Sequence, residues 1–130
     1  SNNDLDLFDE MRDAAMLGKL AADDPSAMAA ETIVDCATTN AAAVLDMDAG
    51  RIETGAPADF VVIDLDQPHL TPAHDLVSHL AYAVRGSDVK HTVCDGQVLM
   101  RDRDVLGVDE AAIRERANEH ATALVERAAE

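Results

Sequence analysis

Apolar residues in the first third of the chain recur at helical spacing. Over residues 4–22 they return every three or four positions, forming one face made of Leu7, Phe8, Met11, Ala14, Ala15 and Gly18. Asn3 is the expected N-cap of this helix. Gly18 indicates a close approach to another element. Residues 26–37 predict a second helix, and a short third helix is expected to end at Leu45.

The apolar pattern then changes to that of strands. Residues 60–63, Phe-Val-Val-Ile, are a continuous apolar run, which is typical of a strand covered on both faces. A short helix is expected over residues 75–84, with either Thr71 or Asp75 as its cap. Two strands at 89–94 and 97–101 are joined by Asp95-Gly96, the sequence of a type I′ turn in which both residues take positive φ.

A last helix is predicted over residues 109–129, with Asp109 as its cap. The side chains expected to face inward are Ile113, Ala117, Ala121, Leu124 and Ala128. Gly86 is expected to end the preceding helix as its C′ residue. The three N-terminal helices leave two architectures open, a free-standing bundle and the last helices of a (β/α) barrel.

The composition limits which binding partners and which cellular compartment are expected. At 130 residues one domain is expected, and a net charge of −16 excludes nucleic acid and anionic membranes as partners. Because the chain is rich in acid and Ala and has two Lys, we expect a protein of salt-rich cytoplasm, in which counter-ions screen self-repulsion. An acidic protein without salt adaptation is the alternative. No signal peptide or long apolar run is found, so a cytoplasmic protein is predicted.

The residues that could carry chemistry do not form a motif. Cys36 and Cys94 are far apart and are expected to be two reduced, buried, inert thiols. His69, His74 and His79 are spaced by five residues, so on a helix neighbouring ones would point about 140° apart. Because zinc ligands must converge, these histidines are expected to be structural or exposed. No catalytic residue and no metal ligand is therefore assigned within this chain.

Two strand motifs and the order of elements carry a resemblance. Residues 50–64 run G-R-I-E-T-G-A-P-A-D-F-V-V-I-D, residues 74–83 run H-D-L-V-S-H-L-A-Y-A, and residues 93–100 run V-C-D-G-Q-V-L-M. Together they resemble the C-terminal part of the amidohydrolase superfamily, in the branch that holds methylthioadenosine/S-adenosylhomocysteine deaminases and chlorohydrolases. Residues 37–42, A-T-T-N-A-A, are similar to the family's A-T-x-N-G-A segment, with Ala41 in place of Gly.

The resemblance implies an α/β fragment in three parts. Residues 1–45 would be the last helices of a metal-dependent (β/α)₈ barrel, and residues 46–106 part of a small flanking β-sandwich with an inserted helix. Residues 107–130 would be a C-terminal helix. The family's metal-binding His and Asp residues would precede Ser1, so this chain alone would bind no metal. The complete enzyme would hold a divalent metal ion, with zinc as the expected metal. The missing N-terminal part of the barrel would be its partner.

The resemblance also implies a site and an activity. Ser1 would lie just beyond the last barrel strand, at the face where barrel active sites form, so Ser1 and Asn2 are the candidate substrate-binding residues. Hydrolytic deamination of an aminated purine or related heterocycle is expected of the complete enzyme. Cyclic amide hydrolysis and dehalogenation are the alternatives within the class. A non-catalytic assembly module is the alternative outside it, and a homo-oligomer is compatible with either.

Overall fold

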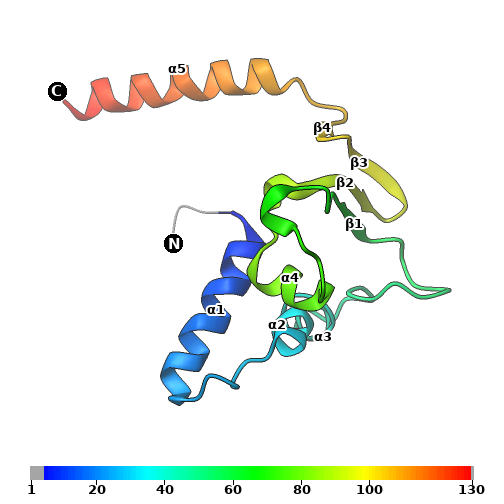
Figure 1. Cartoon of the computed structure of the whole chain (residues 1–130). Coiled ribbons are helices and arrows are strands. Elements are labelled where there is room, and N and C mark those ends of the chain that lie inside the picture. Colours follow the sequence, from blue (N-terminus) through cyan, green and yellow to red (C-terminus); the bar gives the residue numbers. More distant parts are fainter. Residues whose placement is uncertain (1–4, 130) are drawn as a thin grey trace.

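A computed structural model describes residues 5–129 of the chain as a helical cluster, a small sheet and a separate C-terminal helix (Figure 1). The cluster contains α1 (Leu7–Ala22), α2 (Ala30–Ala37), α3 (Thr39–Val44) and α4 (Leu76–Tyr82). The sheet contains β1 (Phe60–Ile63), β2 (Val89–Cys94), β3 (Gln97–Arg101) and β4 (Asp104–Val105). Two 3₁₀ turns, η1 (Pro68–Leu70) and η2 (Gly86–Asp88), flank α4, and α5 (Glu110–Ala128) follows the sheet.

The core lies between α1, α2 and α4. Met11 and Ala15 of α1 pack with Ile33 of α2 and Ala81 of α4, and all four are buried. The expected close approach at Gly18 is confirmed, because a Cβ there would collide with the side chain of Met28. The predicted apolar face of α1 is therefore confirmed in part: Met11 and Ala15 are buried, whereas Leu7 and Ala14, which were expected on the same face, are exposed.

The second helix begins later than expected, at Ala30 rather than residue 26. The preceding segment is held instead as a loop, with Met28 at φ 50°. Lys19 donates hydrogen bonds to the carbonyl oxygens of Ala27 and Met28, each at 2.8 Å, and to the hydroxyl of Tyr82 at 2.9 Å. Because the lysine ammonium satisfies these carbonyls, the segment does not need a further helical turn to do so.

The sheet is antiparallel throughout, in the order β1-β2-β3-β4. The β2–β3 hairpin is confirmed: Cys94 pairs with Gln97, and Asp95 and Gly96 have φ values of 49° and 73°. The strand at 60–63 is not covered on both faces by the described residues. Its first three side chains retain 37–45% of their accessible surface, although they alternate between the faces of the sheet.

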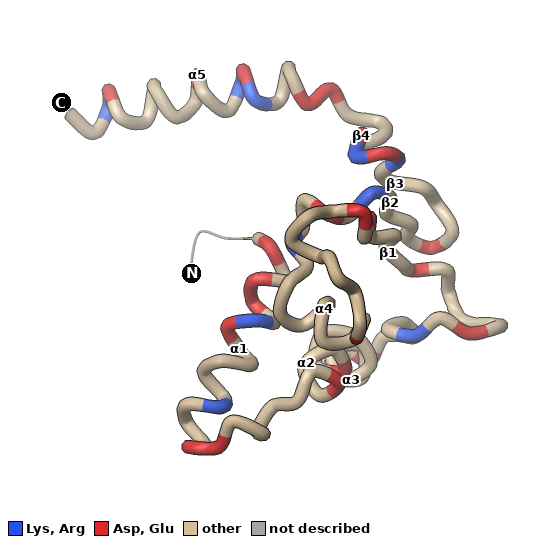
Figure 2. Tube along the Cα trace, in the orientation of Figure 1, with Lys and Arg blue, Asp and Glu red and all other residues tan. Residues whose placement is uncertain are grey.

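The C-terminal helix stands apart from the rest (Figure 1). Its bounds match the prediction closely, but it has no buried residue, and Ile113 and Leu124 are 52% and 58% exposed. The prediction that its apolar stripe faces inward is therefore wrong for the described chain. The physical reason is that no element of residues 5–129 packs along it. In Figure 2 acidic residues occur along both the helices and the loops of the trace, so the negative charge is spread along the chain.

Three smaller expectations are also corrected. Cys36 and Cys94 are both exposed rather than buried. The first helix starts at Leu7 and is capped by Asp6, whereas Asn3 lies outside the described residues. Gly86 opens η2 and lacks a left-handed φ, so it is not the C′ residue of α4. No helix of residues 5–129 has the length and apolar character required to cross a bilayer.

Candidate functional site

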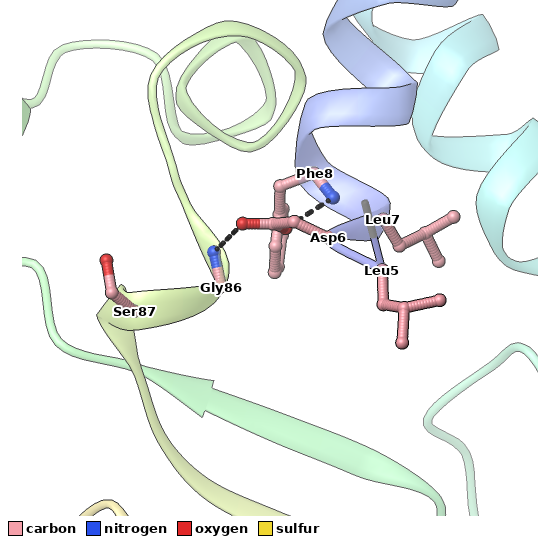
Figure 3. A pocket seen from close by; sticks show the side chains of 6 residues that line it. All are labelled: Leu5, Asp6, Leu7, Phe8, Gly86 and Ser87. Atoms are coloured by element: carbon pink, nitrogen blue, oxygen red, sulfur yellow. Dashed lines mark hydrogen bonds between the residues drawn. The ribbon is translucent and has the colours of Figure 1, made fainter. Parts of the chain in front are cut away.

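The start of α1 carries the candidate site. A hollow there is lined by Leu5, Asp6, Leu7, Phe8, Gly86 and Ser87 (Figure 3). Asp6 lies at its centre. Its Oδ1 accepts a hydrogen bond from the backbone N–H of Phe8 at 3.0 Å, which caps the helix, and its Oδ2 accepts one from Gly86 N–H at 2.7 Å. Residues 80 positions apart in the sequence are thus joined by one carboxylate.

The predicted substrate-binding residues, Ser1 and Asn2, lie outside the described residues. The sequence places both within five residues of Asp6, directly ahead of α1. The described part of the site is the hollow itself, whose walls are an apolar side from α1 and a polar side from η2 (Figure 3). Such a hollow can position an adjacent segment of polypeptide. The residues that line it include no nucleophile paired with a base.

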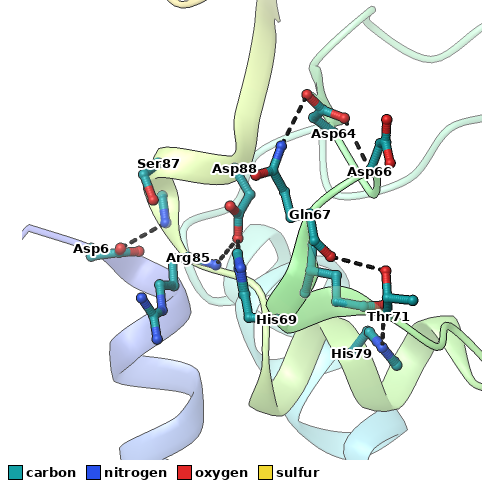
Figure 4. A network of polar contacts seen from close by, with 12 residues as sticks. Asp6, Asp64, Asp66, Gln67, His69, Thr71, His79, Arg85, Ser87 and Asp88 are labelled. Carbon is teal, nitrogen blue, oxygen red and sulfur yellow. Dashed lines mark hydrogen bonds and ion pairs between the residues drawn. The ribbon is translucent and has the colours of Figure 1, made fainter.

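The turn η2, which lines one side of this hollow, is held in place by hydrogen bonds. Asp88 is 4% exposed, and its Oδ2 lies 2.9 Å from Nε2 of His69 and accepts a hydrogen bond from the backbone N–H of Arg85 at 2.9 Å (Figure 4). The His69 side chain is 34% exposed. A buried carboxylate is tolerated only when it is hydrogen-bonded, and these two contacts satisfy that need.

Further bonds tie η2 to the sheet. The N–H of Asp64, which directly follows β1, donates to the carbonyl of Asp88 at 2.9 Å. Arg103, between β3 and β4, donates from Nε to the carbonyl of Ser87 at 3.0 Å and from its terminal nitrogen to Asp64 Oδ2 at 3.3 Å. The pKa of Asp64 is lowered, chiefly because its carboxylate accepts from the N–H of Asp66 and then because it faces Arg103.

The histidines do not come together as ligands. His69 points to Asp88, whereas His79 places Nδ1 2.8 Å from the carbonyl oxygen of Asp75 and Nε2 3.1 Å from that of Leu70. Within residues 5–129 no three side chains of His, Cys, Asp or Glu gather closely enough to hold a metal ion. The described residues therefore do not fit a zinc site, which needs three or four converging ligands.

Sequence reasoning missed the bond between Asp6 and Gly86 and the pair formed by Asp88 and His69. Neither pair belongs to a shared periodic pattern, because each links separate elements through side chains. The sequence carries no signal for the first pair, because it assigns Gly86 the role of a C′ residue; only the structure, in which Gly86 lacks a left-handed φ, leaves the approach of Asp6 as the reason for this glycine.

Comparison with known proteins gives the chain its relatives. Residues 1–99 match the model of the amidohydrolase family. The chain is 76% identical over 128 residues to a 5-methylthioadenosine/S-adenosylhomocysteine deaminase of Haloarcula marismortui, covering 98% of this chain and 30% of the relative. It is 45% identical over 127 residues to a 5′-deoxyadenosine deaminase of Methanosarcina mazei, covering 98% of this chain and 29% of that protein.

Solved structures agree with this assignment. A zinc-bound adenosine deaminase from Xanthomonas campestris superposes with a TM-score of 0.94 at 35% identity, over 97% of this chain and 29% of the other. A zinc complex of the atrazine chlorohydrolase of Arthrobacter aurescens superposes with a TM-score of 0.73 at 27% identity, over 91% and 26%. The chain thus spans about 30% of the length of the curated relatives it matches. The resemblance that the strand motifs indicated is confirmed, and the chain belongs to the amidohydrolase family.

Proposed function

We propose that this chain is the C-terminal part of an enzyme that hydrolytically deaminates an aminated purine nucleoside, of the methylthioadenosine or S-adenosylhomocysteine type. Water replaces the exocyclic amino group of the purine, and ammonia leaves. The observation that carries the proposal is the 76% identity, along 98% of the chain, to a relative named for that activity. Relatives named 5′-deoxyadenosine deaminase support an adenosine-type base with a modified 5′ position.

In this proposal the three parts of the chain have separate roles. Residues 1–45 contribute the last helices of a (β/α)₈ barrel, residues 46–106 part of a β-sandwich, and residues 107–130 a helix that covers another part of the enzyme. The exposed faces of β1 and the bare stripe of α5 support this division, because apolar surfaces of this extent are usually covered. The partner is the polypeptide that forms the remainder of the barrel, and a homo-oligomer in the cytoplasm is compatible with it.

The metal belongs elsewhere in the proposed enzyme. Solved relatives are described with bound zinc, which supports a divalent metal in the complete enzyme. Because residues 5–129 offer no set of converging ligands, the ligands would have to come from other segments. This chain would instead place Ser1 and Asn2 beside the substrate, at the barrel face where the loops that follow the strands gather.

The test compares the 130-residue chain with a longer protein, which also contains the residues that the gene encodes upstream of Ser1. Both proteins are purified in multimolar KCl. Ammonia release from methylthioadenosine, S-adenosylhomocysteine and 5′-deoxyadenosine is measured together with zinc content. We expect activity and zinc only in the longer protein. Turnover with stoichiometric zinc in the 130-residue chain would contradict the division of roles, and a longer protein inactive on all three nucleosides would contradict the activity.

A second candidate activity is hydrolytic dehalogenation of a chlorinated heterocycle. The similarity to the atrazine chlorohydrolase favours it, although both the TM-score and the identity are lower than for the adenosine deaminase. Atrazine supplied to the longer protein, with chloride release as the readout, separates the two. Hydrolysis of a cyclic amide adds one water across the ring C–N bond and releases neither ammonia nor chloride, so mass spectrometry would detect it as a ring-opened product. A non-catalytic assembly module would give none of these products.

A further inference from the structure

The C-terminal helix α5 presents an apolar stripe that no element of residues 5–129 covers. The helix has no buried residue, and Ile113 and Leu124 are 52% and 58% exposed. Because successive residues of a helix turn by about 100°, both lie within one sector of about 80° that also holds Ala117, Ala121 and Ala128. A long helix with one continuous, uncovered apolar side is typical of an element that docks on another surface.

The charged side chains of α5 are sorted around this stripe. Arg116 and Arg127 border it on one side and Arg114 on the other, each within about 60° of its edge. Glu110 lies on the stripe side in the first turn, where the helix dipole favours an anion. The remaining acidic residues of the helix lie on the opposite side: Glu115, Glu119 and Glu126. The stripe and its three arginines therefore form one docking face, apolar in the middle and basic at both edges.

The three arginines of the docking face are available to a partner. Arg114 and Arg127 each donate from Nε to a carbonyl of their own helix, at 3.3 Å. Within residues 5–129 neither these two nor Arg116 forms an ion pair with a carboxylate. The charges that border the stripe are therefore not neutralised by the described part of the chain.

The rest of this chain does not supply the surface on which α5 docks. The adenosine deaminase of Xanthomonas campestris superposes over 97% of the chain with a TM-score of 0.94, values too high for a 19-residue helix to be placed differently. The separation of α5 from the helical cluster is thus shared with a solved relative, of which the matched part covers 29%. The covering surface must come from polypeptide other than residues 5–129.

Two other occupants fit the docking face poorly. A second α5 packed on it would bring arginines against arginines at the edges, in a parallel or an antiparallel pair, and like charges oppose such pairing. A membrane surface favours helices whose polar side is rich in Lys and Arg, whereas the polar side of α5 is acidic and the helix has four Glu against three Arg. The face instead fits an apolar surface with acidic edges.

The position of α5 indicates where that surface lies. Figure 1 shows α5 running back from the sheet beyond the end of α1 at which the chain enters that helix. In a (β/α) barrel this end carries the loops that follow the strands. We propose that the docking face of α5 binds these loops, in the part of the enzyme ahead of Ser1, at an apolar patch with acidic edges. This inference rests on the proposed function, which supplies that part of the enzyme, and it names the contact that α5 makes there.

The test compares hydrogen exchange of the α5 amides in the 130-residue chain and in the longer protein that also contains the residues upstream of Ser1. We expect exchange in α5 to slow at least about tenfold in the longer protein, because docking protects the helix. Equal exchange in the two proteins would overturn the proposal. Light scattering on the same samples gives the oligomeric state. Protection that appears only in a dimer and fades on dilution would assign the docking face to a second copy, which would also overturn it.

Single substitutions in the longer protein test the chemistry of the contact. Leu124→Ser interrupts the apolar stripe and should return the exchange of α5 to its rate in the 130-residue chain. Arg116→Gln removes a charge at the edge and should speed exchange about twofold to fivefold, the effect of one exposed ion pair. Thr122→Glu, on the polar side, is the matched control, because it changes the net charge by the same amount and should leave exchange unaltered. Equal effects of Arg116→Gln and Thr122→Glu would contradict the acidic edges.

Removal of α5 tests the place of the contact. A longer protein that ends at Val108 should exchange faster in the loops that follow the barrel strands. Unchanged exchange in those loops would refute the docking site. Ammonia release from methylthioadenosine is measured separately on the intact longer protein, so that an inactive protein with a protected α5 counts against the proposed function and not against the docking.

Discussion

Replacing Asp88 with Ala should weaken the junction between the helices and the sheet more than any exposed acidic substitution. Asp88 is 4% exposed and satisfies both His69 and the N–H of Arg85. The alanine removes Oδ2, the one oxygen that makes both contacts, and leaves the Arg85 N–H without its partner. A carboxylate that is lost from a buried site costs more than one lost from the surface, because its former donors are not fully resolvated.

The expected loss follows from the two contacts. A hydrogen bond to an ionised group contributes about 1.5–3 kcal/mol, which applies to the Arg85 N–H. The His69 side chain is 34% exposed, so its contact is discounted to about 0–1 kcal/mol. Together they predict a loss of about 1.5–4 kcal/mol. Asp88→Asn should lose only about 1 kcal/mol, because both contacts are made by one oxygen and the Asn carbonyl oxygen can take its place, accepting from the Arg85 N–H and from an Nε2–H of His69.

The assay is hydrogen exchange at the Arg85 amide in multimolar KCl, which reports the free energy of local opening. Urea unfolding followed by circular dichroism gives the global value. Asp104→Ala, at the exposed strand β4, is the control and should change stability by less than about 0.5 kcal/mol. If Asp88→Ala and Asp104→Ala prove equal, the buried carboxylate does not hold the junction.

Three further predictions concern the rest of the chain. In the 130-residue chain the amides of α5 should exchange at least about tenfold faster than those of Met11 and Ala15, because an uncovered helix of this length is marginal; equal protection would show that something covers it. The pKa of Cys94 is raised, chiefly by the negative charge of Asp59 and next by burial, so Asp59→Asn should lower it, enlarge the thiolate fraction near about pH 8 and speed alkylation of Cys94. The exposed Cys36 is the internal control, and an unchanged rate at Cys94 would refute the electrostatic cause. Lowering KCl from about 1 M to about 0.1 M lengthens the Debye length from about 3 to about 10 Å, so a chain of charge −16 should unfold at lower urea concentration; a midpoint independent of salt would refute salt adaptation.

Elements with strong local signals were predictable from the sequence. The β2–β3 hairpin follows from Asp95-Gly96, whose positive φ values leave few other turns available. The bounds of α5 follow from the Asp109 cap, and α4 begins after the Asp75 cap as one of two expected starts. In each case the information lies within a few neighbouring residues, so the rest of the fold is not needed to interpret it.

The parts that could not be predicted depend on distant partners. The start of α2 is set by Lys19, whose ammonium takes the carbonyls that another helical turn would have used. The family could be predicted from the sequence because its strand motifs are local. The candidate site could be predicted only in part. Ser1 and Asn2 stay predictions, and the carboxylate that joins α1 to η2 belongs to no pattern of spacing.

The crowding of bonds around η2 has a mechanical consequence. One three-residue turn is attached to α1 by Asp6, to η1 by His69, to the end of β1 by Asp64 and to the β3–β4 bend by Arg103. Among the described residues these hydrogen bonds converge on one turn, so we expect a tilt of the sheet to displace the start of the first helix as well. A ligand that displaces the outer strands of the sheet should therefore also shift Asp6 and the hollow at the start of α1, which lies 80 residues before Gly86 in the chain.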